Sequence, residues 1–446
     1  MLKEKEKKLE LISLVYCSIA LLIIFLSHLF SIKILMISGI VIACTGIVIL
    51  PYICKITILL SFLPWMEVLK LSPSSPTLYH MLYFSFLMFI VLKEKKIKIK
   101  SLLMILIFSI YIFFNRFIRG NLIELGFAAY IMSIIFLDLL MLNYEKYCNK
   151  ILCINSLYLG IISSFLAEKV FRNINHMTIY LSSDTYTNSI DAIRYAGLFN
   201  DSNFISVLIL MTLCFSFNIF KYEKLNKRRK RIMFFNLTIV SLFGFLTSSK
   251  MFFVGISIIL LSIVLKSILK VRIKTIFLLF LILILVGYIF FKLGILDGIL
   301  FRLNDLKVNN NDFSNGRIDI LNQYMNFFYN NVYELFFGIG MYDRIYLNDI
   351  STHNTFVSLI YQMGIIGTIF IYIPVLFNII KNIKELSVKN DPVIIIIFII
   401  CCASLDILMN EALPLYIIII IMCLVRKGHA SREEKNYEGI SNCTSL

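Results

Sequence analysis

Long apolar runs separated by short polar segments make up most of this chain. About 14 such runs recur between Leu11 and Val425, and runs of about 17 to 25 apolar residues are long enough to cross a bilayer as helices. The sequence shows no alternating pattern typical of an outer-membrane barrel, so helices remain the way to satisfy the backbone in lipid. The expected spans are 11–31, 34–50, 52–66, 77–92, 101–118, 120–143, 151–168, 202–220, 232–249, 251–266, 275–292, 355–379, 393–409 and 411–425.

Composition supports the same fold class. The chain is 59% hydrophobic and only 16% charged, with a mean hydropathy of +0.86, whereas about a quarter of the residues in soluble domains are charged. These values exclude a water-soluble fold. We therefore predict an all-α polytopic membrane protein in which residues 1–446 form a single integral membrane domain.

The distribution of basic residues predicts the orientation. Lys and Arg close to membrane helices stay preferentially in the cytoplasm, and most of the 43 Lys and Arg residues fall in alternate connections, such as 93–100 and 227–231. Both termini are therefore expected in the cytoplasm, and the first apolar run is expected to remain as a helix. The net charge of +16 follows from this topology. It does not indicate a nucleic-acid partner, because there is no soluble domain to carry a basic patch.

Two connections on the expected extracytoplasmic side are long, residues 169–201 and 293–354. Long loops in compact folds are often functional. In the second loop, apolar residues recur at three- and four-residue steps over 316–337, which predicts an amphipathic helix that can lie on the membrane surface. Ser314 and Asn315 are its candidate N-caps. Gly338-Ile339-Gly340 is expected to end it.

His353 is a candidate general base. It stands at the expected outer mouth of the span 355–379, where an imidazole titrates near neutral pH and exchanges protons with water. The alternative is an interfacial or helix-capping histidine without a chemical role.

Basic residues on the expected outer side form a second candidate group. They are Arg194, Lys250 and Arg317, with Arg116 and Arg119 more distant. Their position opposes the overall charge bias, and Arg binds phosphate oxygens in a bidentate manner. Snorkelling or salt bridges to nearby carboxylates would explain each of them equally well.

Several catalytic signatures are absent from the sequence. There is no phosphate-binding GxxxxGK[ST] or GxGxxG loop, no HExxH zinc motif and no DxD pair. No metal and no cofactor are therefore expected. An enzyme acting on the outer face would need an activated donor that is already anchored in the membrane.

Four short motifs occur between residues 194 and 367. His353-Asn354, nine residues and then Gly364-x-x-Gly367 resemble the pattern of the O-antigen ligase and polymerase superfamily. A second motif, Thr247-Ser248-Ser249-Lys250, resembles the TxSR motif of the same superfamily, except that Lys250 stands where Arg is usual; it keeps the charge but loses the planar fork. The other two motifs are Arg194-Tyr195-Ala196-Gly197 leading to Asp201-Ser202-Asn203, and Ser314-Asn315-Gly316-Arg317.

The resemblance implies a metal-independent, inverting glycosyltransferase with a polyprenyl-diphosphate-linked donor. We expect a Wzy-type polymerase that joins undecaprenyl-diphosphate-linked oligosaccharide repeat units into capsular or O-antigen polysaccharide at the outer face of the cytoplasmic membrane. A flippase and a chain-length regulator would be its partners beside the lipid bilayer. By the same resemblance, Arg317 would hold the diphosphate with Arg194 and Lys250, His353 would take the acceptor proton, and Asn203 and Asn354 would bind substrate.

Other functions fit parts of the pattern. The motifs do not separate a polymerase from a WaaL-type ligase that transfers lipid-linked glycan to another acceptor. A lipid-linked oligosaccharide flippase or another transporter also fits about 14 spans, but the sequence shows no inverted repeat. A structural scaffold would give no reason for the spacing between His353 and the two glycines.

Overall fold

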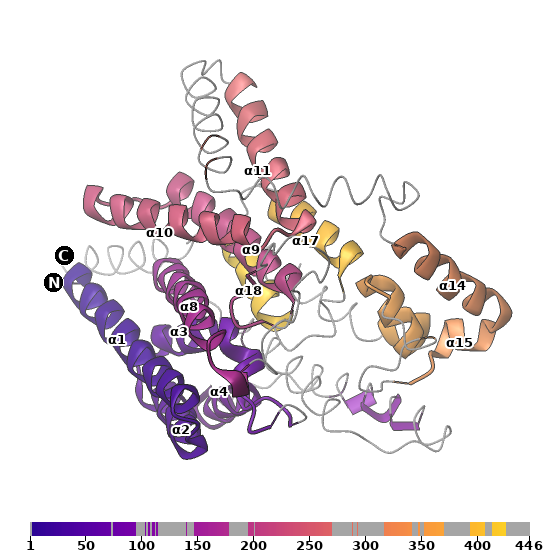
Figure 1. Cartoon of the computed structure of the whole chain (residues 1–446), viewed down its shortest axis with the longest axis horizontal. Helices are drawn as coiled ribbons and strands as arrows, with labels where there is room; N and C mark the ends of the chain where they lie inside the picture. The colour runs from indigo at the N-terminus through magenta and orange to yellow at the C-terminus, as the bar shows by residue number, and fades with distance from the viewer. Residues whose placement is uncertain are drawn as a thin grey trace, which may run out of the picture.

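Every regular element that the structure describes is a helix, which confirms the all-α class (Figure 1). The structure is a computed structural model. It describes residues 2–94 except 73 and 74, 147–177, 195–199, 201–269, 316–340, 352–369, 393–405 and 413–424, together with isolated positions that include Tyr111 and Leu347. The predicted spans 101–118, 120–143 and 275–292 lie largely outside these residues, as does the second half of 355–379.

Three of the described helices are long and apolar enough to cross a membrane. They are Lys8–Leu29 within α1 (Leu2–Leu29), α8 (Lys150–Phe171) and α9 (Ser202–Tyr222). Their bounds agree with the predicted spans to within a few residues at the apolar ends. Shorter apolar helices in the described part of the chain are Lys33–Ile49, Tyr79–Lys93, Lys250–Leu265, Thr355–Ile369, Val393–Ser404 and Leu413–Leu424.

The remaining elements follow in chain order. The first half contains α2 (Lys33–Ile49), α3 (Tyr52–Phe62), the 3-10 helix η1 (Leu63–Val68), α4 (Tyr79–Glu94) and η2 (Asn175–Met177). The second half contains α10 (Lys227–Leu246), α11 (Lys250–Leu269), α14 (Arg317–Asn330), α15 (Val332–Phe337), α17 (Val393–Ser404) and α18 (Leu413–Leu424).

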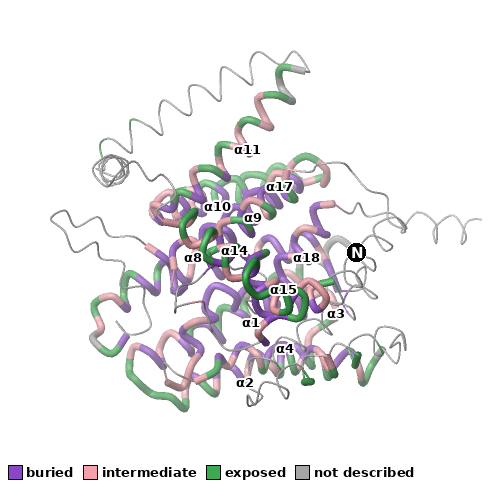
Figure 2. The backbone as a smooth tube through the Cα atoms, turned by 90° about the vertical axis from the view of Figure 1, so that its right-hand side faces the viewer, coloured by how far each residue is buried: buried purple, intermediate pink, exposed green. Residues whose placement is uncertain are grey.

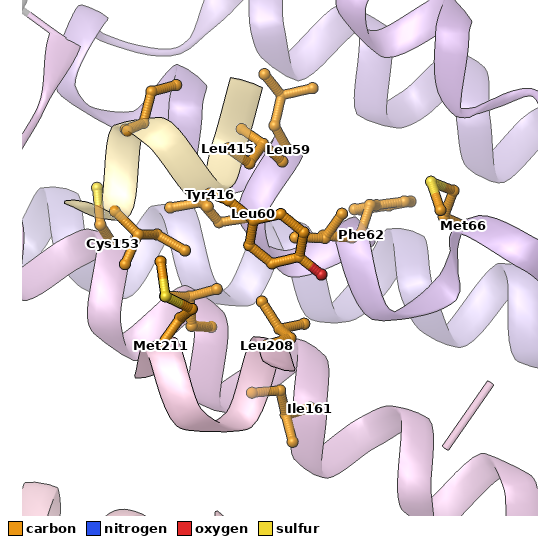
Figure 3. Close-up of a cluster of buried hydrophobic side chains, with 14 of the residues drawn as sticks. Leu59, Leu60, Phe62, Met66, Cys153, Ile161, Leu208, Met211, Leu415 and Tyr416 are labelled. Atoms are coloured by element: carbon orange, nitrogen blue, oxygen red, sulfur yellow. The ribbon is translucent and has the colours of Figure 1, made fainter. Parts of the chain in front are cut away.

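Helix α9 lies at the centre of the bundle. It contacts α8, α10, α11, α17 and α18. Most of its side chains are buried, and they lie all around the helix, as expected of a helix that is apolar all round. Figure 3 shows the packing: Leu208 and Met211 of α9 meet Ile161 of α8, Phe62 of α3 and Tyr416 of α18. These contacts place α9 inside the bundle, with its first residue, Ser202, buried.

The third predicted span is shorter than expected. Residues 52–66 form an 11-residue α-helix, α3, which then tightens into η1. Pro64 lies in the first turn of η1 and has no N–H to continue an α-helix. An 11-residue helix is about 16 Å long at 1.5 Å per residue, which is too short to cross a bilayer.

The predicted loop helix 316–337 is wrong as one continuous helix. The structure divides it at Asn331 into α14 and α15, and the N-cap of α14 is Gly316, with φ of 75°, instead of Ser314 or Asn315. At the break, both the backbone N–H and the side-chain amide of Asn331 donate to the Phe327 carbonyl. Asn side chains compete in this way with the helical backbone.

Candidate active site

The Thr247-Ser248-Ser249-Lys250 motif forms the tight turn between α10 and α11. The buried Thr247 hydroxyl donates to the Gly244 carbonyl at 2.6 Å and accepts hydrogen bonds from the Ser206 hydroxyl and the Ser249 N–H. Ser248 has a positive φ of 48°. The turn places the exposed Lys250 at the first position of α11.

The described part of the motif that begins at Arg194, residues 195–199 and 201–203, is bound to this turn. The Tyr195 N–H donates to the Leu246 carbonyl at 3.3 Å, and the Ala196 N–H donates to the buried Glu168 carboxylate at 3.1 Å. The Ser249 hydroxyl donates to the Asn203 side-chain oxygen at 2.6 Å. The side chain of Asn203, predicted to bind substrate, therefore connects two of the motifs.

Asp201 is the N-cap of α9. Its carboxylate accepts from the Asn203 N–H at 2.7 Å, and its side chain is half-buried. A carboxylate at this position is favoured by the positive end of the helix dipole. The buried α9 therefore positions one negative charge beside the turn.

Asn354 starts the helix Thr355–Ile369 in the same way. Its side-chain oxygen accepts from the N–H groups of Phe356 and Val357 at 3.0 and 3.2 Å, and the Thr355 hydroxyl donates to the Leu405 carbonyl just after α17. Capping therefore occupies Asn354, the other residue predicted to bind substrate. The preceding His353 is exposed and has a positive φ of 47°. That backbone conformation costs a non-glycine residue about 1 to 2 kcal/mol, and such outliers are frequent at functional sites.

The charges of Arg317 and Asp201 both act on His353. The pKa of His353 is lowered from its usual value, first by partial removal of the ring from water and then by the Arg317 guanidinium, while the Asp201 carboxylate acts to raise the pKa. Charges act in this way over short distances. Residues 201 and 317, which are far apart in the sequence, therefore both lie within electrostatic range of His353.

The pair α14 and α15 docks on the helix that follows His353 (Figure 1). Tyr324 and Phe328 of α14 pack against Val357 and Tyr361, and the Tyr324 and Tyr361 rings meet edge to face at 5.0 Å. This packing places α14, which begins at Arg317, against the helix that follows His353.

Gly364 and Gly367 of the sequence motif form the backbone surface on which α14 and α15 dock, which we call the docking seat. The N–H groups of Ile339 and Gly340 donate to the carbonyls of Tyr361 and Gln362 at 2.8 and 3.0 Å. Gly364 has φ of 69°, and a Cβ on it would overlap the Phe336 carbonyl. A Cβ on Gly367 would lie 2.7 Å from the Tyr111 ring. The spacing of Gly364 and Gly367 therefore serves close backbone approach.

Tyr111 also forms hydrogen bonds at the docking seat. Its hydroxyl lies 2.9 Å from the Phe337 carbonyl and 2.8 Å from the Met363 carbonyl and donates to both. Tyr111 was not among the predicted site residues, because it lies in an apolar run with no motif around it.

The predicted site residues have different outcomes. Arg317 lies within electrostatic range of His353, whereas Asn203 and Lys250 lie at the turn between α10 and α11 and Asn354 caps its helix. Arg194 lies outside the described residues. Within the part of the chain that the structure describes, no three His, Cys, Asp or Glu side chains gather in a group able to hold a metal ion.

Comparisons with known proteins give no relative. No protein-family model, no curated protein and no solved structure matches the chain.

Asp201→Asn is expected to lower the pKa of His353 further. Asparagine caps helices as well as aspartate does, so α9 keeps its start while the negative charge that raises the pKa of His353 is lost. The neutral imidazole then persists to lower pH. The midpoint for carbethoxylation of His353, followed by peptide mass spectrometry across a pH series, should move to lower pH.

Asp319→Asn is the matched control. Asp319 is an exposed carboxylate in the first turn of α14, whereas Arg317 and Asp201 are the charges that shift the pKa of His353. The control should leave the midpoint in place. An unchanged midpoint in Asp201→Asn would show that this carboxylate does not act on His353.

Proposed function

We propose that the chain is a glycosyltransferase of the cytoplasmic membrane that polymerises undecaprenyl-diphosphate-linked oligosaccharide repeat units. In this proposal the chain has about 14 spans and cytoplasmic termini, and the site lies at the outer face. The observation that supports it best is that α14, which begins at Arg317, packs on the helix that follows His353, so that the Arg317 guanidinium acts on this histidine and lowers its pKa.

Arg317 is suited to the diphosphate of the donor. It is half-buried and begins the 14-residue helix α14. The positive end of the helix dipole and the first N–H groups favour an anion at that end, and the guanidinium fork matches phosphate oxygens. In the proposed reaction these groups stabilise the charge that develops on the leaving diphosphate.

His353 is suited to the acceptor. Its side chain is exposed beside Arg317, and its lowered pKa leaves the imidazole neutral and able to accept a proton at neutral pH. The acceptor hydroxyl oxygen attacks the anomeric carbon of the donor sugar and its proton passes to His353. The bond from that carbon to the diphosphate oxygen breaks, and the undecaprenyl diphosphate leaves with the electron pair. Attack opposite the leaving group inverts the anomeric configuration.

The test is complementation of a host in which the gene is deleted, with glycan products separated by size. Wild-type protein should restore a ladder of polymer. Arg317→Ala should reduce transfer by about 10²- to 10³-fold, the range for loss of one electrostatic donor, and leave single repeat units. Purified protein with labelled lipid-linked donor should show the same loss.

Arg228→Ala is the matched control, because Arg228 is an exposed arginine in the first turn of α10, far along the chain from the site. It should restore the full ladder at equal protein level. A ladder that forms but stays lipid-linked in the deletion strain would instead assign a ligase. Normal laddering by Arg317→Ala would overturn the proposed diphosphate site.

A further inference from the structure

Helices α14 and α15 carry a set of large apolar side chains that the fold does not cover. In α14 the exposed fractions are 60% for Ile318, 46% for Met325 and 85% for Tyr329. In Figure 2, where these two helices face the viewer, exposed stretches run along both.

The exposed apolar residues of α14 are separated from its polar ones. At about 100° per residue, Ile318, Met325 and Tyr329 fall within about 40° of one another. The sector on one side of them packs on the fold through Tyr324 and Phe328. The sector on the other side is polar and consists of Asp319, Asn322, Gln323, Asn326 and Asn330. The helix therefore has a buried face, an exposed apolar face and a polar face.

The exposed apolar face continues onto α15. Val332 and Tyr333 are 56% and 59% exposed, and Phe336 is 44% exposed. The rings of Tyr333 and Phe337 stack at 4.8 Å. We call Ile318, Met325, Tyr329, Val332, Tyr333 and Phe336 the apolar edge. It contains no charged side chain and no amide.

The segment that follows α15 is bound to the apolar helix Thr355–Ile369 well beyond the first turn of that helix. Ile339 and Gly340 bond to the carbonyls of Tyr361 and Gln362, which are six and seven residues after Thr355, or about 10 Å along the helix axis at 1.5 Å per residue. The same helix exposes Phe356 and Ile369, at 45% and 47%. The end of the α14–α15 pair is thus bound to this apolar helix about 10 Å beyond Thr355.

The backbone of residues 337–340, beside this part of the helix Thr355–Ile369, is hydrogen-bonded. The Gly338 N–H donates to the Glu334 carbonyl at 2.7 Å, in addition to the bonds made by Ile339 and Gly340, and the Phe337 carbonyl accepts from Tyr111. Irregular backbone is tolerated in the hydrocarbon region where its polar groups are satisfied by protein.

We propose that the apolar edge of α14 and α15 is immersed in the outer leaflet of the bilayer, with the polar face of α14 toward water. Tyr and Phe suit the boundary between headgroups and acyl chains, and a glycan would instead require the polar groups that lie in the neighbouring sector. Arg317 then stands at headgroup level, where the diphosphate of a polyprenyl lipid lies. The proposal rests on the orientation in the proposed function and does not depend on its chemistry.

The test uses tryptophan variants of the full-length protein in liposomes. Tyr329→Trp and Phe336→Trp report on the apolar edge, and Asn326→Trp on the polar face of the same helix is the matched control. The chain has one natural tryptophan, the buried Trp65, which gives a constant background. Fluorescence is quenched either by phosphatidylcholine brominated on its acyl chains or by iodide on both sides of the membrane.

The two variants on the apolar edge should be quenched severalfold more by brominated lipid than the control, and iodide should quench the control severalfold more than either of them. Iodide quenching of all three variants, without quenching by brominated lipid, would overturn the proposal and leave the edge facing water. If free oligosaccharide then reduced the iodide quenching of the Tyr329→Trp and Phe336→Trp variants, the apolar edge would be assigned to glycan binding. Neither readout uses sugar transfer, so failure of this proposal and failure of the proposed function are distinguishable.

Discussion

His353→Asn is expected to reduce sugar transfer by about 10²- to 10⁴-fold, the usual effect of removing a general base. Asparagine is the informative substitution because it tolerates the positive φ of 47° at this position. It also cannot accept a proton at neutral pH. The rate is measured with purified protein and labelled lipid-linked donor, at matched protein level and with thermal stability recorded.

His353→Gly separates chemistry from structure. Glycine also accepts the positive φ, and because the His353 side chain is exposed, added imidazole can reach the space that it leaves. Imidazole should restore part of the rate in His353→Gly and none in Arg317→Ala. A rate near that of wild type in His353→Asn would show that another group takes the proton.

Gly364→Ala is expected to detach α14 and α15 from their seat. A Cβ forced into φ of 69° costs about 1 to 2 kcal/mol. Its overlap with the backbone at Phe336 and Gly338 adds about 1 to 3 kcal/mol, as for overpacked cores. Helix α14, which begins at Arg317, would then no longer be held on the helix that follows His353, so sugar transfer should fall together with docking. Limited proteolysis within 316–340 reports docking directly.

Gly316→Ala is the matched control for the seat. Gly316 has a similar φ of 75°, but no atom lies within 4 Å of a Cβ built there. It should therefore show the strain without the overlap, and proteolysis within 316–340 should remain close to that of wild type. Equal protease sensitivity in the two variants would mean that close approach at Gly364 does not hold the helices.

The helices of the bundle were predictable from apolar runs. The bounds of α2, α8 and α9 agree with predicted spans because these helices are apolar over most of their length. The end of α15 at Phe337 is confirmed, since Gly338 has a positive φ of 72°. The break at Asn331 was not predicted, because the apolar periodicity continues across it; there the backbone leaves the helical region, with φ of −128° and ψ of 69°.

For the candidate site, the sequence predicted which residues belong to it but not which of them lie close together. Apolar periodicity carries no information on which loops meet, so the proximity of Arg317, His353 and Asp201 required the structure. The structure also changes the meaning of the motifs. Thr247, Asn354 and Gly364 serve a turn, a helix start and a docking seat, and their spacing has a physical reason that is independent of chemistry.

The hydrogen bond from the Thr355 hydroxyl to the Leu405 carbonyl limits how early during synthesis the chain can form the candidate site. The helix that presents His353 is held by a residue made about fifty positions later, and α9 packs against the still later α18. The ribosome must therefore pass Leu405 before the helix start is secured, and α18 before the central helix is enclosed. A chain shortened by a late frameshift would contain every motif residue and still lack the contacts that hold them in register.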